Sequence, residues 1–599
     1  MLVAGHDHLL KVSFVGARPT APQACQSNRC ATQPTGPNAA SDPSEIRYRA
    51  LWPGIDLHYD TARGIVRSTY HIAPGADAGA IRLAYNVDFD VDSSGALMFR
   101  LKSGALAETA PIAWQEIDGQ RAYVPVSFEV LPGRRLGFRV GDHDPGKQLI
   151  IDPTLYWNSF LGGAGGDVGV AAAAEAAGGN VYVVGTSSAS WGAPGVVREH
   201  SGSDDAFVTL LSTTTGQLVW YTFLGGSGSE SGAGVAIDSS GRLFVTGSGD
   251  SDWSAIQPNP APPPVRPRSG QLDAFVARLD AATGFVQWLT YLGSGGIDYG
   301  QGIASDGLGN LYVTGYSPAS WPPGPEPAPL RAYSGADDAF VAKLSVSSGA
   351  MAWNTFLGSA ASDFGSSIVT DSSGNVVVTG RSAATWGSNP VRAYSGDLDA
   401  FVARLSAAGS IAWHTFLGGT SFDGGNAIAA DQAGNVYISG RSDGSWGIPS
   451  VRPFAGGREA FVARLDGVSG VISWHTFLGS PGSDFGYGVA SDPTGRIYVT
   501  GRSPSTWGTP IRPISPGGDG FVALLAASDG LLLSNTFLGG DGADEGVAVS
   551  CDGSGQAFVV GTSDFGWGTP VRPHSGNSSN DAFVARLWLD PLVFANGFE

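Results

Sequence analysis

The chain has 599 residues and a formal net charge of -19 at pH 7, with 88 glycines, 37 prolines and only 15% charged residues. This acidic balance disfavours nonspecific binding to nucleic acid or to anionic membranes, because both would repel it. No run approaches the roughly 18 apolar residues that a membrane helix needs. The length exceeds what one ordinary core holds, so we expect two domains and no membrane span.

Residues 1–10 lack the apolar stretch of a signal peptide and contain His6, Asp7 and His8. Either the protein is not exported, or this start lies downstream of the true one. The low lysine content and the pattern rich in Ser, Thr and Gly favour the second explanation. We therefore expect a secreted or cell-surface protein.

Residues 1–152 are expected to form an all-β domain of the β-sandwich type. Five segments alternate apolar and polar residues, with Pro-Gly or Ser-Gly turns between them, as half-buried strands do. These segments are 46–60, 65–71, 81–85, 96–101 and 121–130. Residues 19–43 are rich in Pro, Ala, Ser, Gln and Asn and predict a long flexible loop. Within it, Cys25 and Cys30 are candidates for a disulfide or for metal binding, although no further Cys or His cluster completes a four-ligand site.

One pattern recurs seven times between residues 155 and 589: an aromatic-Leu-Gly turn, an alternating strand, a loop with Trp and Arg, and a strand close to Ala-Phe-Val-Ala-Arg-Leu. Such self-similarity predicts supersecondary units that stack to bury their apolar faces. Two hairpins are expected in each unit, and four antiparallel strands repeated seven times predict a seven-bladed β-propeller. The aromatic landmarks, spaced 60 to 68 residues apart, are Phe160, Phe223, Tyr291, Phe356, Phe416, Phe477 and Phe537.

The two ends of the repeat array are complementary. No Phe-Val-Ala-Arg-Leu strand precedes Trp157, and no Trp-x-Thr-Phe-Leu-Gly strand follows Leu587. Joining the ends completes a seventh blade from one strand at the start and three at the end, which leaves no edge strand exposed. Within each blade we expect the Gly-x-Ala-Ile-Ala strand to be innermost and the Trp-x-Thr-Phe-Leu strand outermost. Residues 590–599 form a short tail, for which a docking or sorting role and an ordered cap on the last blade are alternatives.

The motifs Trp-x-Thr-Phe-Leu-Gly-Gly and Asp-x-x-Gly-Asn-Val-Tyr-Val-Thr-Gly resemble those of the bacterial SBBP (seven-bladed β-propeller) repeat family, from about Leu155 to Leu587. The upstream motifs Arg-Ala-Leu-Trp-Pro-Gly-Ile-Asp-Leu, from Arg49, and Leu-Ile-Ile-Asp-Pro, from Leu149, resemble the uncharacterised all-β domain that commonly precedes such propellers. The resemblance implies the fold and an exported or surface location. It implies no activity, because the family is defined by fold.

Two loop sets are expected on one face of the propeller. The loop before each inner strand carries a carboxylate, and the long loop between the second and third strands carries a Trp followed by an Arg. The carboxylates are Asp167, Glu230, Asp298, Asp363, Asp423, Asp484 and Asp544. From the two sets, the candidate binding face consists of Trp253, Trp321, Arg266, Arg331, Asp298 and Asp363.

These loop sets have a functional and a structural interpretation. A ring of carboxylates near the channel mouth would suit calcium, and exposed Trp and Arg side chains would stack on sugar rings. A residue type repeated seven times instead serves what seven blades share, namely packing between neighbours, with each Arg paired to a carboxylate as Arg392 would be to Asp399. The histidines have no partner at triad spacing and the Gly-x-Gly strings precede no helix, so we predict no catalytic residue and no cofactor, and leave metal binding open.

The repeat is broken at three places. Residues 254–264 and 322–329 are proline-rich insertions, which predict stiff protrusions that act as packing spacers or as one wall of a recognition site. Ser534 stands where the other six units have Trp.

The sameness of the seven units favours a noncatalytic, exported or surface-associated propeller that binds a protein or a carbohydrate as a monomer, with the first domain as an attachment or assembly module. One alternative is an extracellular glycan hydrolase or lyase with its site at the channel mouth. It would need two carboxylates, or a set of Arg, His and Tyr side chains, converging from different blades. A purely structural scaffold is the other alternative.

Overall fold

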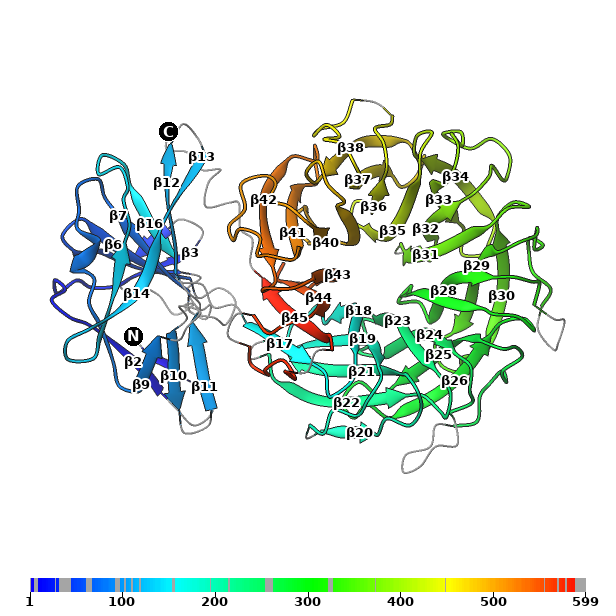
Figure 1. Cartoon of the computed structure of the whole chain (residues 1–599), viewed down its shortest axis with the longest axis horizontal. Coiled ribbons are helices and arrows are strands. Elements are labelled where there is room, and N and C mark those ends of the chain that lie inside the picture. The colour runs from blue at the N-terminus through cyan, green and yellow to red at the C-terminus, as the bar shows by residue number, and fades with distance from the viewer. Residues whose placement is uncertain are drawn as a thin grey trace. The chain divides into compact units, whose positions relative to one another are not determined.

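The structure of the chain is a computed structural model, in which two compact units can be distinguished, Met1–Trp157 and Asn158–Glu599 (Figure 1). The residues that it describes are 2–4, 9–26, 29–31, 45–60, 67–91, 97–101, 104–108, 111–117, 120–152, 157–193, 195–213, 216–253, 262–321, 327–371, 373–447, 449–553, 555–567, 570–576 and 579–587.

The first unit consists of three sheets and one short 3-10 helix, η1 (Ala78–Ala80). The largest sheet has the strand order β13-β12-β16-β7-β6-β5-β3-β4, the second β1-β2-β8-β15-β14 and the third β11-β10-β9. The strands are β1 (Leu2–Ala4), β2 (Leu9–Phe14), β3 (Gln23–Gln26), β4 (Arg29–Ala31), β5 (Glu45–Trp52), β6 (Ile55–Asp60), β7 (Arg67–Ile72), β8 (Leu83–Tyr85), β9 (Asp88–Val91), β10 (Leu97–Leu101), β11 (Gly104–Glu108), β12 (Ile112–Ile117), β13 (Gln120–Val124), β14 (Val126–Leu131), β15 (Arg135–Val140) and β16 (Leu149–Asp152).

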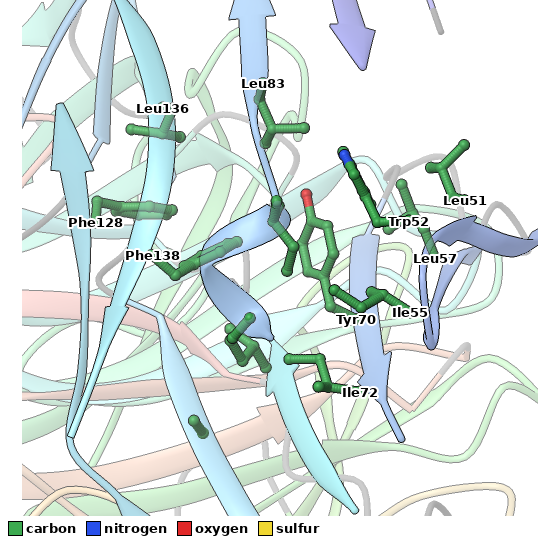
Figure 2. Close-up of a cluster of buried hydrophobic side chains, with 14 of the residues drawn as sticks. Leu51, Trp52, Ile55, Leu57, Tyr70, Ile72, Leu83, Phe128, Leu136 and Phe138 are labelled. Carbon is green, nitrogen blue, oxygen red and sulfur yellow. The ribbon is translucent and has the colours of Figure 1, made fainter. Parts of the chain in front are cut away.

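One hydrophobic core joins the sheets of the first unit. Tyr70 of β7 packs edge-on against Phe138 of β15, with ring centroids 5.1 Å apart, and Phe138 in turn contacts Phe128 of β14 at 5.5 Å. Figure 2 shows these rings together with Trp52 and Ile55 at the turn between β5 and β6. The alternating residues of these strands therefore place one face of each sheet in a shared interior, as in a β-sandwich.

The segment 19–43, predicted as a loop, contains two short strands in its described part. β3 extends the largest sheet by pairing with β5, and β4 pairs with β3 so that Cys25 stands opposite Cys30. Backbone hydrogen bonds to the edge of β5 make up for the lack of a clear apolar alternation here, which is why the pattern did not predict strands. The side chains of both cysteines lie outside the described residues, and the choice between disulfide and metal ligands stays open.

The second unit is a β-propeller of seven sheets, which are its blades. Blades 1 to 3 consist of β18 (Asp167–Ala174), β19 (Asn180–Ser187), β21 (Asp205–Ser212) and β22 (Leu218–Leu224), with β20 (Val196–Arg198) beside β22; of β23 (Glu230–Ile237), β24 (Leu243–Gly249), β25 (Asp273–Leu279) and β26 (Val286–Leu292); and of β27 (Tyr299–Ser305), β28 (Asn310–Ser317), β29 (Asp338–Ser345) and β30 (Met351–Leu357).

Blades 4 to 6 repeat the same order. They consist of β31 (Asp363–Thr370), β32 (Val376–Ser382), β33 (Asp399–Leu405) and β34 (Ile411–Leu417); of β35 (Asp423–Ala430), β36 (Asn435–Ser442), β37 (Glu459–Asp466) and β38 (Ile472–Leu478); and of β39 (Phe485–Ser491), β40 (Arg496–Ser503), β41 (Asp519–Ala526) and β42 (Leu532–Leu538). The Gly-x-Ala-Ile-Ala strand is the first of its sheet and the Trp-x-Thr-Phe-Leu strand the last, as predicted.

Blade 7 closes the ring. It has the order β17-β45-β44-β43, in which β17 (Trp157–Leu161) comes from the start of the repeat array and β43 (Asp544–Cys551), β44 (Ala557–Ser563) and β45 (Asp581–Leu587) come from its end. The inner strand β18 contacts both β23 and β43, so the seven inner strands form a closed circuit, visible at the centre of the ring in Figure 1. The all-β class, the seven blades and the shared last blade are therefore confirmed.

The Thr-Gly that ends the second strand of many units has a packing reason. Gly380 of β32 lies opposite Phe401 of β33, and a β-carbon there would lie 1.9 Å from the Phe364 carbonyl oxygen of the inner strand and 2.8 Å from the Phe401 ring. Because the inner-strand backbone and the phenyl ring occupy the space where a side chain would stand, only glycine fits. The close inner strand and the buried Phe of the third strand therefore both require the glycine of the second strand.

Candidate functional site

The carboxylates that begin the inner strands are buried in turns. Asp298 and Asp363 are both 0% exposed. Oδ2 of Asp363 accepts hydrogen bonds from the Ser359 N–H and hydroxyl, at 2.7 and 3.0 Å, and Oδ1 accepts one from the Ser382 hydroxyl. These carboxylates tie each loop to the end of the second strand. They do not form the open ring at the channel mouth that the functional interpretation would need, because every one of them is covered by its own turn.

Each of these carboxylates lies close to a second one, which begins the third strand of the preceding blade. A β-carbon at Gly418 would lie 2.7 Å from Asp399 Oδ1 and 2.8 Å from Asp423 Oδ2, so the two carboxylates face each other across this glycine. Burial, with a smaller contribution from Asp399, raises the pKa of Asp423 to about 7. Burial likewise raises the pKa of Asp338 to about 6. We call these two-residue sets the carboxylate pairs.

The carboxylate pairs give no metal centre of the usual kind. Within the described ranges, no group of three or more His, Cys, Asp or Glu side chains is placed to hold a metal ion. Calcium binding stays a prediction.

The predicted Trp and Arg side chains form the junctions between blades. Trp253 and Trp321 are 0% and 5% exposed. The guanidinium carbon of Arg266, in blade 2, lies 5.9 Å from the ring centroid of Trp321, in blade 3, and Arg331 stands in the same way 5.8 Å from Trp386. Each Arg therefore spans from its own blade to the Trp of the next one, which is the arrangement that packing between neighbours requires.

The hydrogen bonds of these arginines go to backbone carbonyls. Arg331 donates from Nη1 to the Phe356 carbonyl at 2.9 Å and from Nη2 to the Gly358 carbonyl at 2.7 Å. The predicted pairing of each Arg with the carboxylate seven residues further on is found as an ion pair in blade 6, where Arg512 Nη1 lies 3.9 Å from Asp519 Oδ2. Arg392 donates its hydrogen bonds to the Phe416 and Gly418 carbonyls instead, although its charge still acts on Asp399. The Phe carbonyl lies on the free edge of the last strand of its sheet and the Gly carbonyl lies just beyond the end of that strand, and a planar guanidinium reaches both at once.

The six residues of the candidate binding face are distributed over three successive blade junctions: Trp253 lies beside Arg198, Arg266 and Asp298 lie beside Trp321, and Arg331 lies near Asp363. Asp298 and Asp363 are enclosed in their turns, Trp253 and Trp321 are covered, and the two arginines are half-buried. Whether any of them contacts a ligand stays a prediction. Their contacts in the structure serve the stacking of the blades.

A different cluster occupies the end of the ring that carries the same loops. It is formed by the first residues of the inner strands and the last residues of the second strands of blades 3 to 7, together with loop residues of blade 5. We call it the arginine-aromatic arc. Its members are Tyr299, Tyr316, Phe364, Arg381, Phe422, Arg441, Asp443, Arg458, Phe485, Tyr487, Arg502 and Glu545.

The first part of the arc is aromatic. Tyr299 and Tyr316 are cross-strand partners with stacked rings 4.8 Å apart, and Tyr316 packs edge-on at 4.8 Å against Phe364 of the next blade. Burial, followed by the neighbouring Tyr299, raises the pKa of Tyr316 to about 12. The Tyr316 phenol is therefore a neutral hydrogen-bonding group on a flat apolar ring at neutral pH.

The middle of the arc holds arginines from adjacent blades. Arg381, exposed at the end of β32, lies with its guanidinium carbon 4.6 Å from the centroid of its cross-strand partner Phe364. Arg441, at the same position of β36, lies 3.8 Å from the centroid of Phe422 and 5.7 Å from that of Phe485. Aromatic faces attract cations, so the rings hold both guanidinium groups in place.

Arg381 and Arg441 have no carboxylate within ion-pair distance among the described residues, although the charge of Asp443 acts on Arg441 from further away. Neither forms an ion pair within the described part of the chain, and the Nε of Arg441 is buried without a hydrogen-bond partner. Burial, followed by repulsion from Arg458, lowers the pKa of Arg441, and Arg381 contributes to the repulsion. Like charges thus converge here although the chain as a whole is strongly acidic.

The far part of the arc is neutralised by ion pairs. Arg458 binds Asp443 through two hydrogen bonds, from Nε at 2.8 Å and Nη2 at 3.2 Å. Arg502 donates to Glu545 of the next blade at 2.9 Å. Phe485 and Tyr487 stack with their centroids 5.9 Å apart.

Reasoning from the sequence did not identify the arc. Its signal is the Gly-Arg-Ser tripeptide at 380–382, 440–442 and 501–503, in a position that is Thr or Ser in blades 1, 2 and 7. Side chains at this position point the same way as those of the inner strand beside it, because they are direct cross-strand partners. Because the residue at this position varies among the blades, the residues that all seven units share do not point to it.

The two proline-rich insertions lie mostly outside the described residues. The described residues resume at Pro262 in the first insertion and at Pro327 in the second. Their predicted role in recognition is therefore untested. Ser534 is described: it lies in β42 opposite Leu524, at the place where Trp474 stands in β38.

Comparison with known families agrees with this architecture. A sequence profile described as Domain of unknown function (DUF7948) matches residues 5–154, and one described as Beta-propeller repeat (SBBP) matches residues 287–319 and 473–508. The chain therefore contains SBBP β-propeller repeats after a DUF7948 domain. The matched stretches of the SBBP repeats run from outer strands into the following inner and second strands, and the resemblance predicted from the sequence is confirmed. No curated protein matches the chain.

Solved structures resemble this chain only distantly. Hydrazine synthase of Kuenenia stuttgartiensis covers 65% of this chain and 92% of its own, with 11% identity and a TM-score of 0.38. Quinohemoprotein alcohol dehydrogenase from Comamonas testosteroni covers 72% of this chain and 76% of its own, with 13% identity and a TM-score of 0.35. At this level of similarity the likeness carries no argument about function. Among its described residues the chain has no helix with the length and apolar character of a membrane span.

Proposed function

We propose that this protein is a noncatalytic, exported or cell-surface binding propeller, whose protein or carbohydrate ligand docks on the arginine-aromatic arc. The observation that supports this proposal is the asymmetry of the arc. The blade junctions repeat around the ring and serve the fold, whereas the arc is confined to blades 3 to 7. On the other blades small residues such as Val168 and Ser231 stand at the corresponding inner position.

Aromatic and arginine side chains are the types that contribute most to recognition surfaces. Preorganisation further favours binding, because the aromatic rings already hold the guanidinium groups and little side-chain freedom is lost when a ligand binds. The first unit would then act as an attachment or assembly module.

An extracellular glycan hydrolase or lyase is the second candidate, and one observation favours it. Tyr487 and Arg502 lie beside Arg441 of the preceding blade, which is a convergent set of the kind that a lyase needs. Burial, followed by the charge of Glu545, raises the pKa of Tyr487 to about 12, so this phenol is a poor general base at neutral pH. Asp443 and Glu545 are engaged in ion pairs with arginines. The arc is therefore better suited to binding than to bond cleavage.

A screen of the full chain against a glycan array and against secreted proteins tests the proposal. The expected result is a ligand whose binding is lost when Tyr316 and Tyr487 are both changed to Ala. Thermal unfolding of the double variant shows whether the fold is retained. Release of products from a panel of polysaccharides would instead establish the enzyme, and a ligand that binds equally well to the double variant would exclude the arc as the site.

A further inference from the structure

We infer that the arginine-aromatic arc recognises the carboxylates of an acidic polysaccharide, an inference that rests on the function proposed above and narrows it to one ligand class. Four arginines and two carboxylates from adjacent blades meet in the arc, and two of the arginines, Arg381 and Arg441, have no carboxylate of their own. In a chain of net charge -19, such a local excess of positive charge is a specific feature of the surface.

The guanidinium groups of Arg381 and Arg441 are placed to bind an anion. Arg441 is repelled by Arg458 and by Arg381, and its Nε is buried without an acceptor. An anionic group placed between Arg381 and Arg441 would relieve this repulsion and accept charge-assisted hydrogen bonds from both sides. Arginine presents its donors in a planar fork, which matches the two oxygens of a carboxylate.

The order of side chains along the arc indicates what carries the anion. Aromatic rings flank the two free arginines, with Tyr299, Tyr316 and Phe364 on one side and Phe485 with Tyr487 on the other. The ligand should therefore present flat apolar faces on both sides of its charge. A chain of uronic acid residues does this, because each ring has an apolar C–H face and each carries one carboxylate.

A nucleic acid also alternates rings with anions, but it fits this protein less well. A DNA duplex carries one charge per about 1.7 Å of its axis, whereas a uronate chain carries one charge per sugar ring, so the field of an acidic protein opposes the nucleic acid more strongly. An acidic peptide supplies carboxylates on flexible stems without the flat rings that the aromatic side chains would contact. Both are outcomes that the test distinguishes.

The test measures the affinity of the full chain for hexauronates by titration calorimetry. Hexasaccharides of galacturonate, mannuronate and glucuronate are compared with the same oligosaccharides after reduction of their carboxyls to alcohols. We expect at least one hexauronate to bind, its reduced form to bind at least tenfold more weakly, and affinity to fall with added salt. Arg381→Gln and Arg441→Gln should each weaken binding by about tenfold, since each removes charge-assisted hydrogen bonds.

A matched control separates the arc from general charge. Arg139→Gln removes an exposed positive charge of the first unit, which pairs with Glu129, and should leave the affinity unchanged. Thermal unfolding of all variants checks that the fold is retained. Equal binding of the reduced oligosaccharides, unchanged binding by both arc variants, tighter binding of oligothymidylate or polyglutamate, or no binding of any hexauronate would each overturn the inference.

Failure of this inference is distinguishable from failure of the proposed function. If a neutral glycan or a protein binds and the Tyr316 and Tyr487 double variant loses it, the arc is a binding site with another ligand class. If no ligand depends on either set of variants, both proposals fail.

Discussion

Gly418 shows why the aromatic-Leu turn of each unit ends in glycine. Its α-carbon stands between Asp399 and Asp423, and no space remains there for a side chain. The residue is required by two buried carboxylates and not by a left-handed backbone conformation. A motif that reads as a flexible turn in the sequence is thus a packing constraint in the structure.

Gly418→Ala should lower the free energy of unfolding by about 1–3 kcal/mol, because the new methyl group would press on both carboxylates, at 2.7 and 2.8 Å. Urea unfolding followed by tryptophan fluorescence measures the change. Gly295→Ala is the control, since no atom lies within 4 Å of a β-carbon there. Equal stability of the two variants would show that the turn accommodates the new methyl group without loss of unfolding free energy.

The carboxylate pairs make stability depend on pH. Burial raises the pKa of Asp423 to about 7 in the folded chain, against an ordinary value of about 4 in the unfolded chain. The folded state therefore holds a proton that the unfolded state has released, and this stability is present at low pH and lost as pH rises through about 7. His414 and His475 act in the opposite sense, because burial lowers the pKa of both.

Comparison with Asp423→Asn isolates the carboxylate. On going from pH 8 to pH 5.5 the wild-type chain should gain about 2 kcal/mol more stability than Asp423→Asn does, since the amide does not titrate. Urea unfolding at both pH values measures the difference. If the two proteins respond to pH in parallel, Asp423 is ionised in the folded state.

At the scale of the element, the outer-strand Trp explains why Ser534 breaks the repeat. Trp474 donates from Nε1 to the Ala527 carbonyl, at 3.1 Å, in the hairpin turn that joins the last two strands of the next blade, and Gly530 of that turn packs on its ring. In blade 7 the last two strands, β45 and β17, come from opposite ends of the array, so there is no such hairpin. Ser534 stands where a Trp would have no turn to contact.

Trp474→Ala should cost about 3–5 kcal/mol in unfolding free energy, because it removes a large buried side chain from a blade junction. Ser534→Ala, at the corresponding position, should change the free energy by less than about 0.5 kcal/mol. Thermal and urea unfolding of both variants test the difference. A large loss with Ser534→Ala would mean that this serine makes contacts of its own.

The blades were predictable from the sequence because one period repeats and the strands within it alternate. The arc was not, for a physical reason: it depends on which strand ends lie side by side around the ring. Arg381 and Arg441 are 60 residues apart in the sequence and occupy the same position of adjacent blades. The hydrogen-bond partners of Arg392 were not predicted, because a carboxylate seven residues away is visible in the sequence, whereas the free carbonyls of an edge strand are not.

At the scale of the whole molecule, the ring depends on a strand that is held without a covalent hairpin. The Phe160 N–H of β17 donates to the Arg572 carbonyl at 3.0 Å, and the Arg572 side chain donates to the Phe160 and Gly162 carbonyls at 2.9 and 2.6 Å. Arg331 makes the same three contacts with Phe356 and Gly358 in blade 3. There, however, a hairpin also joins β30 to β29.

This difference predicts unequal effects of equal substitutions. Arg572→Ala should speed amide hydrogen exchange in β17 by tenfold or more, because the side-chain bonds are a large part of what keeps this strand in the sheet. Arg331→Ala removes the same hydrogen bonds from β30 and should change amide exchange in β30 much less. The hairpin to β29 keeps β30 at a high effective concentration beside its partner strand, so that it pairs again quickly. Exchange measured by mass spectrometry on peptides covering 157–161 and 351–357 makes the comparison. If both strands respond alike, the backbone hydrogen bonds of blade 7 are sufficient to hold β17. The Arg572 side chain then stabilises its blade no more than the corresponding Arg does in the other blades.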